Sequence, residues 1–588
     1  MQYCSLIPDL NLYAVLLENS ISLPSQIGGN NLDEKQYIAY DVICCTFLLQ
    51  LLYEGGNGDT ALGNYLNSTL NCEHNNRRDN LITRLKARGA MDQLIMLLSG
   101  PAGCGKSTSV LLAQQYCHNF CMAVAIAFDD ITFYFTSTTG SSAALFGGMT
   151  IHSAAHLQKT RITDALRKEW EHVRILIIDE ISFFNVTEMQ KLDKQLKRLT
   201  SRHDVPYGGV SIVFSGDFHQ LQPICESDKI LYSCSSGALA WENSVNCAIF
   251  LENSHRFKDD PEYGAILGRM RMGKDTKEDR EKINTRVIGK CGVQVPDVPD
   301  PSYACPTNKE RNGISAGVFK NHIIATHPLI TSNELPPDHT LMIEASIRTK
   351  SKKVSQAVHD VITTMLGDND IKVSEYNRSS AKIDPLLQVF PGSQEMCISN
   401  DDLKKGRGNG TLCRVLGVKL KRGARRQWKN WEGRKVYTVS VDEVDWVEFE
   451  HCGETPKNIP RRFRLKPKTY SCTVQFPLSP DCEGLTLRLG NVKITQIPVN
   501  SNIATTGHKL QGMSKDTLIV NSWSYHFSNW IYVVLSRVRT LSGLYLCRPL
   551  DLYRPFVVPE KLIQFETRMK QREVHFLRTR KLAMAALC

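Results

Sequence analysis

The sequence predicts an α/β protein with two blocks of parallel sheet flanked by helices, and a small all-β insertion in the second block. The first observation behind this prediction is a repeated alternation of short apolar runs with helical stretches. Continuous apolar runs separated by helices are typical of parallel strands that are covered on both faces. We expect such strands at residues 94–98, 131–135, 175–178, 210–214 and 248–251, and again at 517–520, 532–535 and 544–546.

The second observation is a change of pattern between the two blocks. From residue 385 to residue 498, short β-rich stretches alternate with glycine, proline and charged residues, which is typical of a small all-β module. The chain therefore divides into five predicted parts. These are an N-terminal helical region (1–85), a first α/β block (86–250), a second α/β block (251–384 and 499–559), the β insertion (385–498) and a basic C-terminal helix (560–588).

Composition indicates a multidomain globular protein rather than a membrane or secreted one. The chain has 588 residues, of which 42% are apolar and 22% are charged, and a domain usually takes ~100–200 residues. Its apolar runs stay below the ~18–20 residues that cross a bilayer, so we expect 42–53 as a buried helix, followed by a polar loop at 54–80. The 19 cysteines include no C-x-x-C pair, which favours reduced thiols in an intracellular protein.

A glycine-rich loop that follows the first expected strand has the pattern of a phosphate-binding P-loop, GxxxxGK[ST]. Glycines let backbone N–H groups turn toward a phosphate, and the N-terminus of the next helix adds to their attraction. Lys106 is expected to contact the β- and γ-phosphates, and the Ser107 hydroxyl to bind Mg²⁺. The nucleotide-binding residues predicted here are Gly100, Pro101, Ala102, Gly103, Cys104, Gly105, Lys106, Ser107 and Thr108.

Two further strand ends carry polar residues that suit the same chemistry. The strand at 175–178 leads into Asp179 and Glu180. We expect Asp179 to hold Mg²⁺ and Glu180 to orient and deprotonate the attacking water. The strand at 210–214 leads into a Gly-Asp turn, after which Gln220 can contact a γ-phosphate or its water. Carboxyl ends of parallel strands share one edge of a sheet, so the sequence predicts a single triphosphate site with ATP and Mg²⁺ as cofactors.

In their order along the chain, several motifs resemble the Pif-type (petite integration frequency) DNA helicases of superfamily 1B, which are related to the RecD-like enzymes. The similar segments are TTGSSAALFGGMTIHS at 138–153, DEIS at 179–182, GDFHQLQPI at 216–224, LENSHR at 251–256, NIATTGHKLQGMSKD at 502–516 and YVVLSRVRTLSGL at 532–544. The resemblance implies that both α/β blocks are RecA-like P-loop NTPase motor domains. It also implies that the insertion, with Asn409-Gly410-Thr411 near its start, is SH3-like.

The resemblance also assigns residues that spacing alone does not. Gln36 is similar to the family's adenine-recognising glutamine, and Gly512 is expected near the nucleotide. Arg256 and Arg537 are implied to be arginine fingers, donated to the γ-phosphate across a cleft. Contacts with a DNA strand are implied for Thr139, Gly140, His152, Thr506, His508 and Lys509. Gly507 is a departure, since the family usually has a larger apolar residue there.

The β insertion carries a basic patch that suits single-stranded DNA. Lysines and arginines are dense between residues 404 and 435, and Trp428 and Trp431 stand among them. Phosphates can contact the cations, while bases stack on the indoles. A solvated basic hairpin is the alternative interpretation.

These patterns together predict an ATP-dependent DNA helicase that acts on single-stranded DNA and on tailed or forked duplexes and works as a monomer. The resemblance to the Pif-type helicases implies that it moves from five-prime to three-prime. Expected roles are DNA repair, recombination or telomere maintenance, in the nucleus or in mitochondria. Two alternatives are the helicase domain of a Helitron-type mobile element and a nucleotide-dependent remodelling ATPase that acts on protein.

Overall fold

The computed structural model divides the chain into two compact units. Unit 1 comprises residues 1–139, 148–274 and 556–588, and unit 2 comprises 140–147 and 275–555. The structure describes residues 26–27, 30–54, 72–123, 126–145, 148–223, 227–233, 238–290, 292–296, 302–326, 340–349, 352–353, 359–360, 362–363, 373–374, 380–381, 383–399, 407, 410–431, 434–452, 460–477, 486–525, 529–554 and 556–587.

Unit 1 is built on a six-stranded sheet with the order β5-β4-β6-β7-β3-β8. Every neighbouring pair in it is parallel, as the unbroken apolar runs predicted. The strands are β3 (Ile95–Ser99), β4 (Phe133–Ser137), β5 (Met149–Thr150), β6 (Ile175–Asp179), β7 (Ser211–Gly216) and β8 (Cys247–Phe250). The five strands expected in this block are therefore confirmed, with shifts of one or two residues at their ends.

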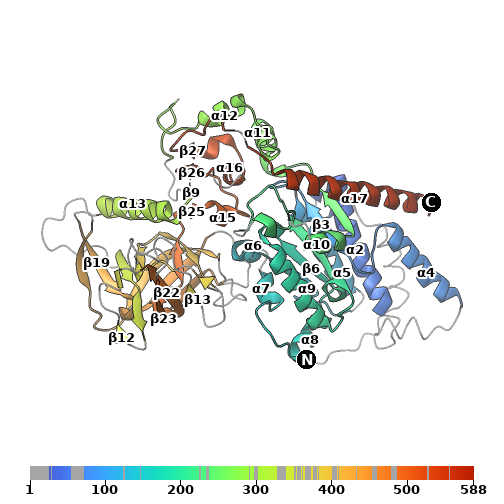
Figure 1. The fold of residues 1–588 in the computed structure, drawn as a ribbon, viewed down its shortest axis with the longest axis horizontal. Helices are drawn as coiled ribbons and strands as arrows, with labels where there is room; N and C mark the ends of the chain where they lie inside the picture. The colour runs from blue at the N-terminus through green and yellow to red at the C-terminus, as the bar shows by residue number, and fades with distance from the viewer. Residues whose placement is uncertain are drawn as a thin grey trace. The chain divides into compact units, whose positions relative to one another are not determined.

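Helices cover both faces of this sheet (Figure 1). Side chains of α7, α8, α9, α10 and α17 form one buried cluster with Leu97, Leu176 and Phe214 of the strands. On the other face, α2 and α5 pack together, and Phe47 of α2 meets Phe133 of β4 at 5.7 Å between ring centroids. The helices are α2 (Glu34–Glu54), α4 (Cys72–Ala87), α5 (Lys106–Ala123), α7 (Ile151–Ala154), α8 (Asp164–Glu171), α9 (Val186–Thr200), α10 (Ala238–Ser244), α11 (Pro261–Arg271) and α17 (Glu560–Ala585).

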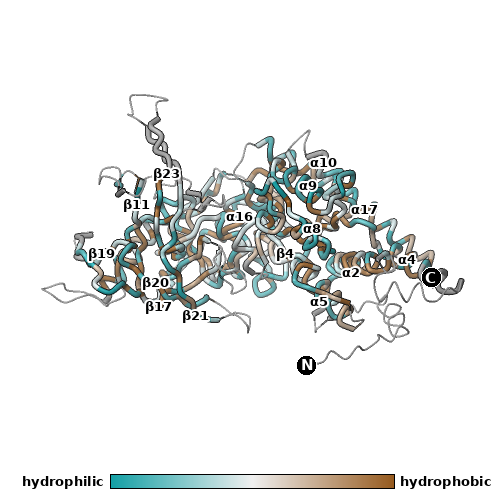
Figure 2. The backbone as a smooth tube through the Cα atoms, turned by 90° about the horizontal axis from the view of Figure 1, so that it is seen from below, coloured by the Kyte–Doolittle hydropathy of each residue, from teal (hydrophilic) through white to brown (hydrophobic). Residues whose placement is uncertain are grey.

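Helix α2 contains the apolar stretch expected as a buried helix. By length and composition alone its residues Glu34–Tyr53 could span a membrane, but 83% of that window is buried inside unit 1. Figure 2 shows the mostly hydrophobic colour of this helix. A helix that is apolar on all sides and covered on all sides is a core helix. The prediction of a polar loop at 54–80 is wrong for its last part, because α4 begins at Cys72.

The parallel sheet of unit 2 has four strands in the order β25-β9-β26-β27. Its strands are β9 (Tyr303–Cys305), β25 (Ala504–Thr506), β26 (Leu518–Val520) and β27 (Leu544–Leu546), and its helices are α12 (Lys277–Asn284), α13 (Asn308–Thr326), α15 (Gly507–Leu510) and α16 (Trp530–Leu535), with α6 (Gly140–Leu145) grouped in this unit. The strand predicted at 532–535 is wrong, since this run is the helix α16. All of its residues are buried, and a short run that is apolar throughout has no periodicity to separate helix from strand.

The β-rich part of unit 2 is larger than predicted. It starts at Leu341 rather than at 385, because β10 pairs in parallel with β19 and β11 pairs with β23, both far along the chain. Its three sheets have the orders β15-β10-β19-β18, β12-β11-β23-β22-β13-β14 and β21-β20-β17-β16-β24. The strands are β10 (Leu341–Glu344), β11 (Ser346–Thr349), β12 (Lys352–Lys353), β13 (Val373–Ser374), β14 (Ser380–Ala381), β15 (Leu386–Val389), β16 (Gln394–Cys397), β17 (Leu412–Leu420), β18 (Gln427–Trp431), β19 (Arg434–Ser440), β20 (Val444–His451), β21 (Arg462–Leu465), β22 (Lys468–Pro477), β23 (Thr486–Gln496) and β24 (Val499–Ser501).

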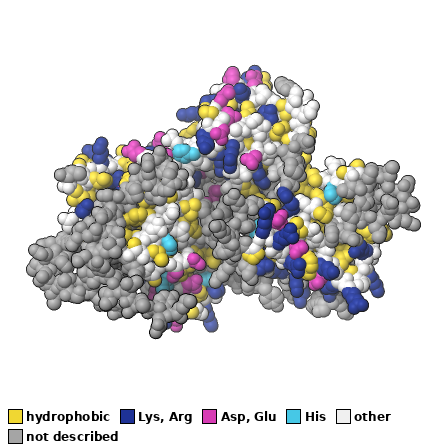
Figure 3. All heavy atoms as spheres, turned by 180° about the vertical axis from the view of Figure 1, so that it is seen from behind, with side chains coloured by type: hydrophobic (Ala, Val, Ile, Leu, Met, Phe, Trp, Pro, Cys, Tyr) yellow, Lys and Arg dark blue, Asp and Glu magenta, His cyan; other side chains and the backbone are white. Residues whose placement is uncertain are grey.

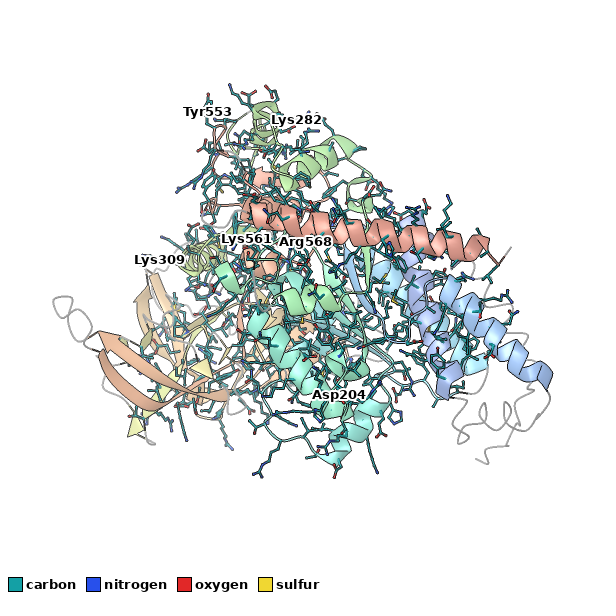
Figure 4. The ribbon with its side chains drawn as sticks, turned by 45° about the vertical axis from the view of Figure 1, so that its right-hand side comes forward. Asp204, Lys282, Lys309, Tyr553, Lys561 and Arg568 are labelled. Carbon is teal, nitrogen blue, oxygen red and sulfur yellow. The ribbon has the colours of Figure 1, made fainter. Side chains whose placement is uncertain are left out.

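Two predicted boundaries of the first block also change. Unit 1 continues past residue 250 to Lys274, and the C-terminal helix α17 belongs to it. Residues Leu562, Phe565 and Met569 of α17 are buried in the unit 1 core. On its polar side, Lys561 donates to the Ser233 carbonyl at 3.3 Å and Arg568 to Glu242 at 2.7 Å (Figure 4). The sequence could not show which block this helix would join.

Phe565 is an aromatic side chain that α17 contributes to that core. Its ring stacks on Trp241 at 5.7 Å and meets Phe218 edge-on at 5.2 Å, and it is fully buried. We predict that Phe565→Ala lowers the free energy of unfolding of unit 1 by ~3–5 kcal/mol. The control Ile563→Ala removes a side chain that is 52% exposed on the same helix and should change it by ~0.5 kcal/mol or less. Urea unfolding followed by tryptophan fluorescence checks this, and equal losses in both variants would contradict it.

Candidate nucleotide site

The P-loop connects β3 to α5 and is closely packed on both sides. Gly103 and Gly105 have φ of 76° and 84°, a conformation that glycine adopts readily and other residues rarely do. A Cβ on Gly103 would lie 2.4 Å from the Cβ of Arg256, and one on Gly105 would lie 2.3 Å from Gln36 Nε2. Both glycines are therefore needed for the loop to curl against its neighbours.

Lys106 is the first residue of α5, and its ammonium folds back over the loop. Nζ donates to the carbonyls of Gly100 at 2.6 Å and Pro101 at 3.1 Å. Ser107 lies beside it in the first turn of α5, where backbone N–H groups have no partner within the helix. A loop with two left-handed glycines, a flexible ammonium and a helix N-terminus fits a di- or triphosphate.

Asp179 and Glu180 lie at the end of β6. The Ser215 hydroxyl donates to Asp179 Oδ1 at 2.7 Å, and the Thr138 hydroxyl donates to the Glu180 carbonyl at 2.7 Å. Glu180 has φ of 55°, in the left-handed region, which costs a non-glycine residue of the order of 1–3 kcal/mol and is found mostly at functional sites. The backbone is thus held in a strained turn that fixes the direction of the Glu180 side chain.

The sheet brings this acidic pair to the P-loop. β7 lies between β6 and β3, and Gly216 at its end is in register with Ser99, the residue before the loop. The Gly100 N–H donates to the Gly216 carbonyl at 3.3 Å. A Cβ on Gly216 would lie 2.9 Å from Ile181 Cγ2, so this glycine lets the turn after β6 approach. The three strand ends therefore share one edge, as the sequence predicted.

The loop after β7, residues 217–221, is called the sensor loop here. Gln220 is buried, and its Nε2 donates to Asp217 Oδ2 at 3.4 Å. Asp217 is fully buried and accepts from Arg271, whose Nε and Nη2 lie at 3.1 and 2.8 Å. Burial alone would raise the pKa of Asp217, but Arg271, together with His219 and Lys106, lowers it to about 2. The sequence did not single out Arg271, because nothing in its local pattern marks it.

Gln36 lies in the first turn of α2, against the P-loop. Its Nε2 donates to the Cys104 carbonyl at 2.9 Å and lies 3.0 Å from His255 Nε2, and its Oε1 accepts from the Asp33 N–H. An amide held at this point can meet the polar edge of a nucleobase. His255 is a second side chain of this pocket that the sequence did not single out.

Arg256 is placed differently from its prediction. It lies in the short helix η5 (His255–Phe257) of unit 1, the unit that carries the P-loop, so it is not donated across a cleft. The His255 N–H donates to the Gly103 carbonyl at 2.9 Å, and the Ser254 hydroxyl to the Ala102 carbonyl at 2.7 Å. These bonds hold η5 beside the loop.

Arg537 follows α16 in unit 2 and is 1% exposed. Its guanidinium donates to the Val533 carbonyl at 2.8 Å, to the Met513 carbonyl at 3.3 Å and to the Ser536 hydroxyl at 2.6 Å. In this conformation the predicted finger is held by the backbone of its own unit. Its contact with a γ-phosphate stays a prediction.

The other predicted residues of unit 2 surround α15. Thr506 ends β25, His508 and Lys509 lie on α15, and Gly512 follows with φ of 82°. The departure at Gly507 has a structural reason. A Cβ there would lie 2.3 Å from Nε1 of Trp530, which is 1% exposed, so the buried indole leaves no room for a larger residue at this position.

The predicted DNA contacts are spread over several elements. Thr139 precedes α6, and its N–H donates to the Ser137 hydroxyl at 3.4 Å, while Gly140 begins that helix. His152 lies on α7, with Nε2 3.1 Å from Glu188 Oε1. Trp428 on β18 is 44% exposed and stacks on Tyr437 at 3.7 Å. Trp431 ends β18 opposite Arg434, and its side chain lies outside the described residues.

The basic patch of the insertion is partly described. Its exposed cations include Lys419, Lys421, Arg422, Arg425 and Arg426. Lys404, Lys405 and Asn409 lie outside the described residues. On the face drawn in Figure 3, Lys and Arg side chains stand among Asp and Glu side chains rather than in a field of one charge. The exposed lysines and arginines of the insertion can contact phosphates.

Gly105 tests the packing of the P-loop. We predict that Gly105→Ala weakens nucleotide binding by about 10–100-fold, because alanine is strained at positive φ and its Cβ displaces Gln36. The control Gly268→Ala lies on α11, where a Cβ meets nothing within 4 Å, and should bind nucleotide as the unaltered chain does. Titration with a fluorescent ADP derivative measures both. Equal affinity in the two variants would contradict the geometry.

The buried ion pair of Asp217 and Arg271 should make the stability of the fold depend on pH. The pKa of the Asp217 carboxyl is about 2 in the folded chain, below its ordinary value of 3.8. The ionised carboxylate therefore stabilises the fold above about pH 4, and this contribution is lost as the pH falls toward 2. The difference amounts to ~2 kcal/mol. We predict that the free energy of unfolding drops by that much more between pH 4 and 2 in the unaltered chain than in Asp217→Asn. Parallel pH curves would refute this.

Comparisons with known proteins agree with this geometry. Residues 89–265 match the family model of the PIF1-like helicases. The ATP-dependent DNA helicase PIF1 of Saccharomyces cerevisiae is 31% identical over 158 residues, which are 25% of this chain and 18% of that protein. The ATP-dependent DNA helicase Pif1 of Bdellovibrio bacteriovorus is 24% identical over 487 residues, covering 80% of this chain and 87% of that one. The chain thus spans less than a fifth of the length of the yeast relative.

The fold has solved counterparts as well. The crystal structure of Bacteroides Pif1 bound to single-stranded DNA superposes with a TM-score of 0.56 at 20% identity and covers 82% of this chain and 94% of that one. This likeness confirms the fold class of two RecA-like domains. The family-model match over residues 89–265 shows that the first motor domain is similar to the PIF1-like helicases.

Proposed function

We propose that the chain is an ATP-dependent DNA helicase that moves from five-prime to three-prime along one DNA strand and separates the duplex ahead of it. The observation that carries the proposal is the shared edge of β3, β7 and β6, where the P-loop, Asp179–Glu180 and the sensor loop meet. A site of this kind suits hydrolysis of a nucleoside triphosphate, and its relatives are named as ATP-dependent DNA helicases.

The P-loop side of the site would bind and orient the triphosphate. Lys106 exchanges the carbonyls of Gly100 and Pro101 for phosphate oxygens, which are stronger acceptors because they are charged. Ser107 and Asp179 would hold Mg²⁺, an ion that proteins usually bind through one or two side chains plus phosphates. When bound there, it would supply positive charge to the phosphate oxygens. Within the described residues no cluster of three His, Cys, Asp or Glu forms a separate metal site.

The remaining residues would act on the γ-phosphate and its water. Glu180 orients the water and takes its proton, and Gln220 hydrogen-bonds to the water or to the phosphate. Arg256, already beside the P-loop, and Arg537, after it leaves its carbonyl partners, supply positive charge to the transition state. Arginine fingers of this kind contribute about 10³–10⁵-fold in rate.

DNA would be held mainly through its backbone. Thr139, Gly140 and His152 in the first block, and Thr506, His508 and Lys509 in the second, offer hydroxyl, N–H and cationic groups to phosphates. Trp428 presents an exposed indole whose other side is supported by Tyr437, so a base can stack on it. Because these contacts are sequence-independent, we propose single strands and tailed or forked duplexes as partners of a monomeric enzyme. A nuclear or mitochondrial role in repair, recombination or telomere maintenance is the corresponding expectation.

DNA-stimulated hydrolysis is the first prediction of this proposal. Single-stranded DNA should raise the ATP turnover of the unaltered chain at least about 10-fold, and this stimulation should fall steeply with salt, because binding releases counterions. Lys106→Ala should abolish turnover with an unchanged melting temperature, while the control Lys168→Ala, an exposed lysine on α8, should retain it. If DNA does not change the ATP turnover, the result favours a remodelling ATPase that acts on protein.

Strand separation with a defined polarity is the more specific test. Duplexes with a single-stranded tail at either the five-prime or the three-prime end are incubated with ATP and Mg²⁺, and the release of a labelled strand is followed. We expect release from the duplex with the five-prime tail. Release only from the three-prime-tailed duplex would refute the proposed direction, and release from neither would refute unwinding.

A further inference from the structure

Four charged or titratable side chains form a buried group behind the sensor loop, called here the buried quartet: Asp217, His219, Arg271 and Glu566. Arg271 holds Asp217 with two N–H groups, as described above. Glu566 Oε1 lies 2.9 Å from His219 Nε2 and 3.8 Å from Arg271 Nη2. The side chains of Asp217, His219 and Glu566 are exposed by 0, 2 and 9%, and that of Arg271 by 14%. The four groups therefore pair with one another almost without water.

The two carboxylates of the quartet depend on their partners for their charge. Burial alone would raise the pKa of Glu566, but the contacts with His219 and Arg271 lower it, so the carboxyl stays ionised. Removing one partner from a buried set of charges leaves another without compensation, which is far more costly than losing a surface pair. The quartet thus fixes its members as a unit.

Within the sensor loop, Asp217 carries this constraint to Gln220. The His219 N–H donates to Asp217 Oδ1 at 3.1 Å, the Gln220 N–H donates to the Asp217 carbonyl at 3.0 Å, and Gln220 Nε2 donates to Asp217 Oδ2. One carboxylate therefore holds both the backbone of the loop and the side chain expected at the γ-phosphate.

The other two members of the quartet lie near two of the four points where the chain passes from one unit to the other; the remaining two flank residues 140–147. The chain leaves unit 1 after Lys274 and returns to it at Phe556. Arg271 ends α11 just before the first crossing, and Glu566 lies in the second turn of α17 after the second one. The two connecting segments touch within unit 1, since a Cβ on Gly273 would lie 2.9 Å from the Phe556 carbonyl oxygen.

We propose that Arg271 and Glu566 are positioning residues that fix Gln220 through Asp217 and His219, and that couple the sensor loop to both connecting segments. The role in hydrolysis rests on the proposed function, whereas the mechanical link does not. A shift of the sensor loop when a γ-phosphate arrives or leaves would pull on the ends of α11 and α17, because buried ion pairs join Asp217 to Arg271 and His219 to Glu566. We expect the nucleotide state of the site to reach the ends of α11 and α17 through these buried charges.

The mechanical link is tested by hydrogen exchange, which needs no enzymatic activity. Glu566→Gln keeps the shape of the side chain and removes its charge. Amides of residues 217–221 should then exchange about 10-fold faster than in the unaltered chain. The matched control Glu560→Gln changes an exposed acid on the same helix and should leave these rates as they are. Arg271→Lys, which keeps the charge but cannot bind Asp217 with two N–H groups, should act in the same direction. Unchanged exchange in both quartet variants would overturn the inference.

The role in hydrolysis is tested by a double-mutant cycle. Glu566→Gln should lower kcat about 10-fold, through a misplaced Gln220, with KM for ATP nearly unchanged. In a Gln220→Ala background the same substitution should cause no further loss, because the residue through which it acts is gone. If the two substitutions lower kcat by factors that multiply, Glu566 acts independently of Gln220, and the positioning role is overturned. If the unaltered chain hydrolyses no ATP, the proposed function fails, and the exchange rates still decide the mechanical link.

Discussion

The alignment of β3, β7 and β6 is the constraint on which the rest of the site depends. Because the three strands are parallel neighbours, their carboxyl ends reach the same edge of the sheet, and the loops that follow begin side by side. The bond from the Gly100 N–H to the Gly216 carbonyl ties the first loop to the third. The loop after β3 contributes the phosphate-binding P-loop, the turn after β6 contributes the acidic pair, and the loop after β7 contributes the sensor glutamine.

Close packing behind this edge holds the loops in conformations that they would not adopt alone. Glu180 keeps a left-handed backbone, and its cost must be met by the surrounding core. Asp217 stays ionised because Arg271, together with His219 and Lys106, lowers the pKa of its buried carboxyl. Helix α17 adds to this support from the far end of the chain, since it contributes Phe565 to the core and Glu566 to the buried quartet. Stability and function are therefore linked through the same few contacts.

The sequence predicted the parts of the site whose patterns are local. The P-loop, Asp179 and Glu180 follow directly from their strands, and the strands themselves appear as unbroken apolar runs. Long-range features were not predictable in this way. Helix α16 was expected as a strand because a short run buried on all sides has no periodicity. The β-rich part was expected to start at 385, because the pairing of β10 with β19 joins distant segments. Arg271 and Glu566 carry no local signal, since their partners are contributed by the fold.

A structure of the chain with a transition-state analogue, such as ADP with aluminium fluoride, Mg²⁺ and single-stranded DNA, tests the central claim most directly. The account predicts the diphosphate in the Gly100–Ser107 loop, with Lys106 released from its carbonyl partners and Mg²⁺ between Ser107 and Asp179. Glu180 and Gln220 should face the fluoride group, and Arg256 and Arg537 should both contact it. A nucleotide bound away from the shared edge of β3, β7 and β6, or both arginines turned away from it, would contradict the account.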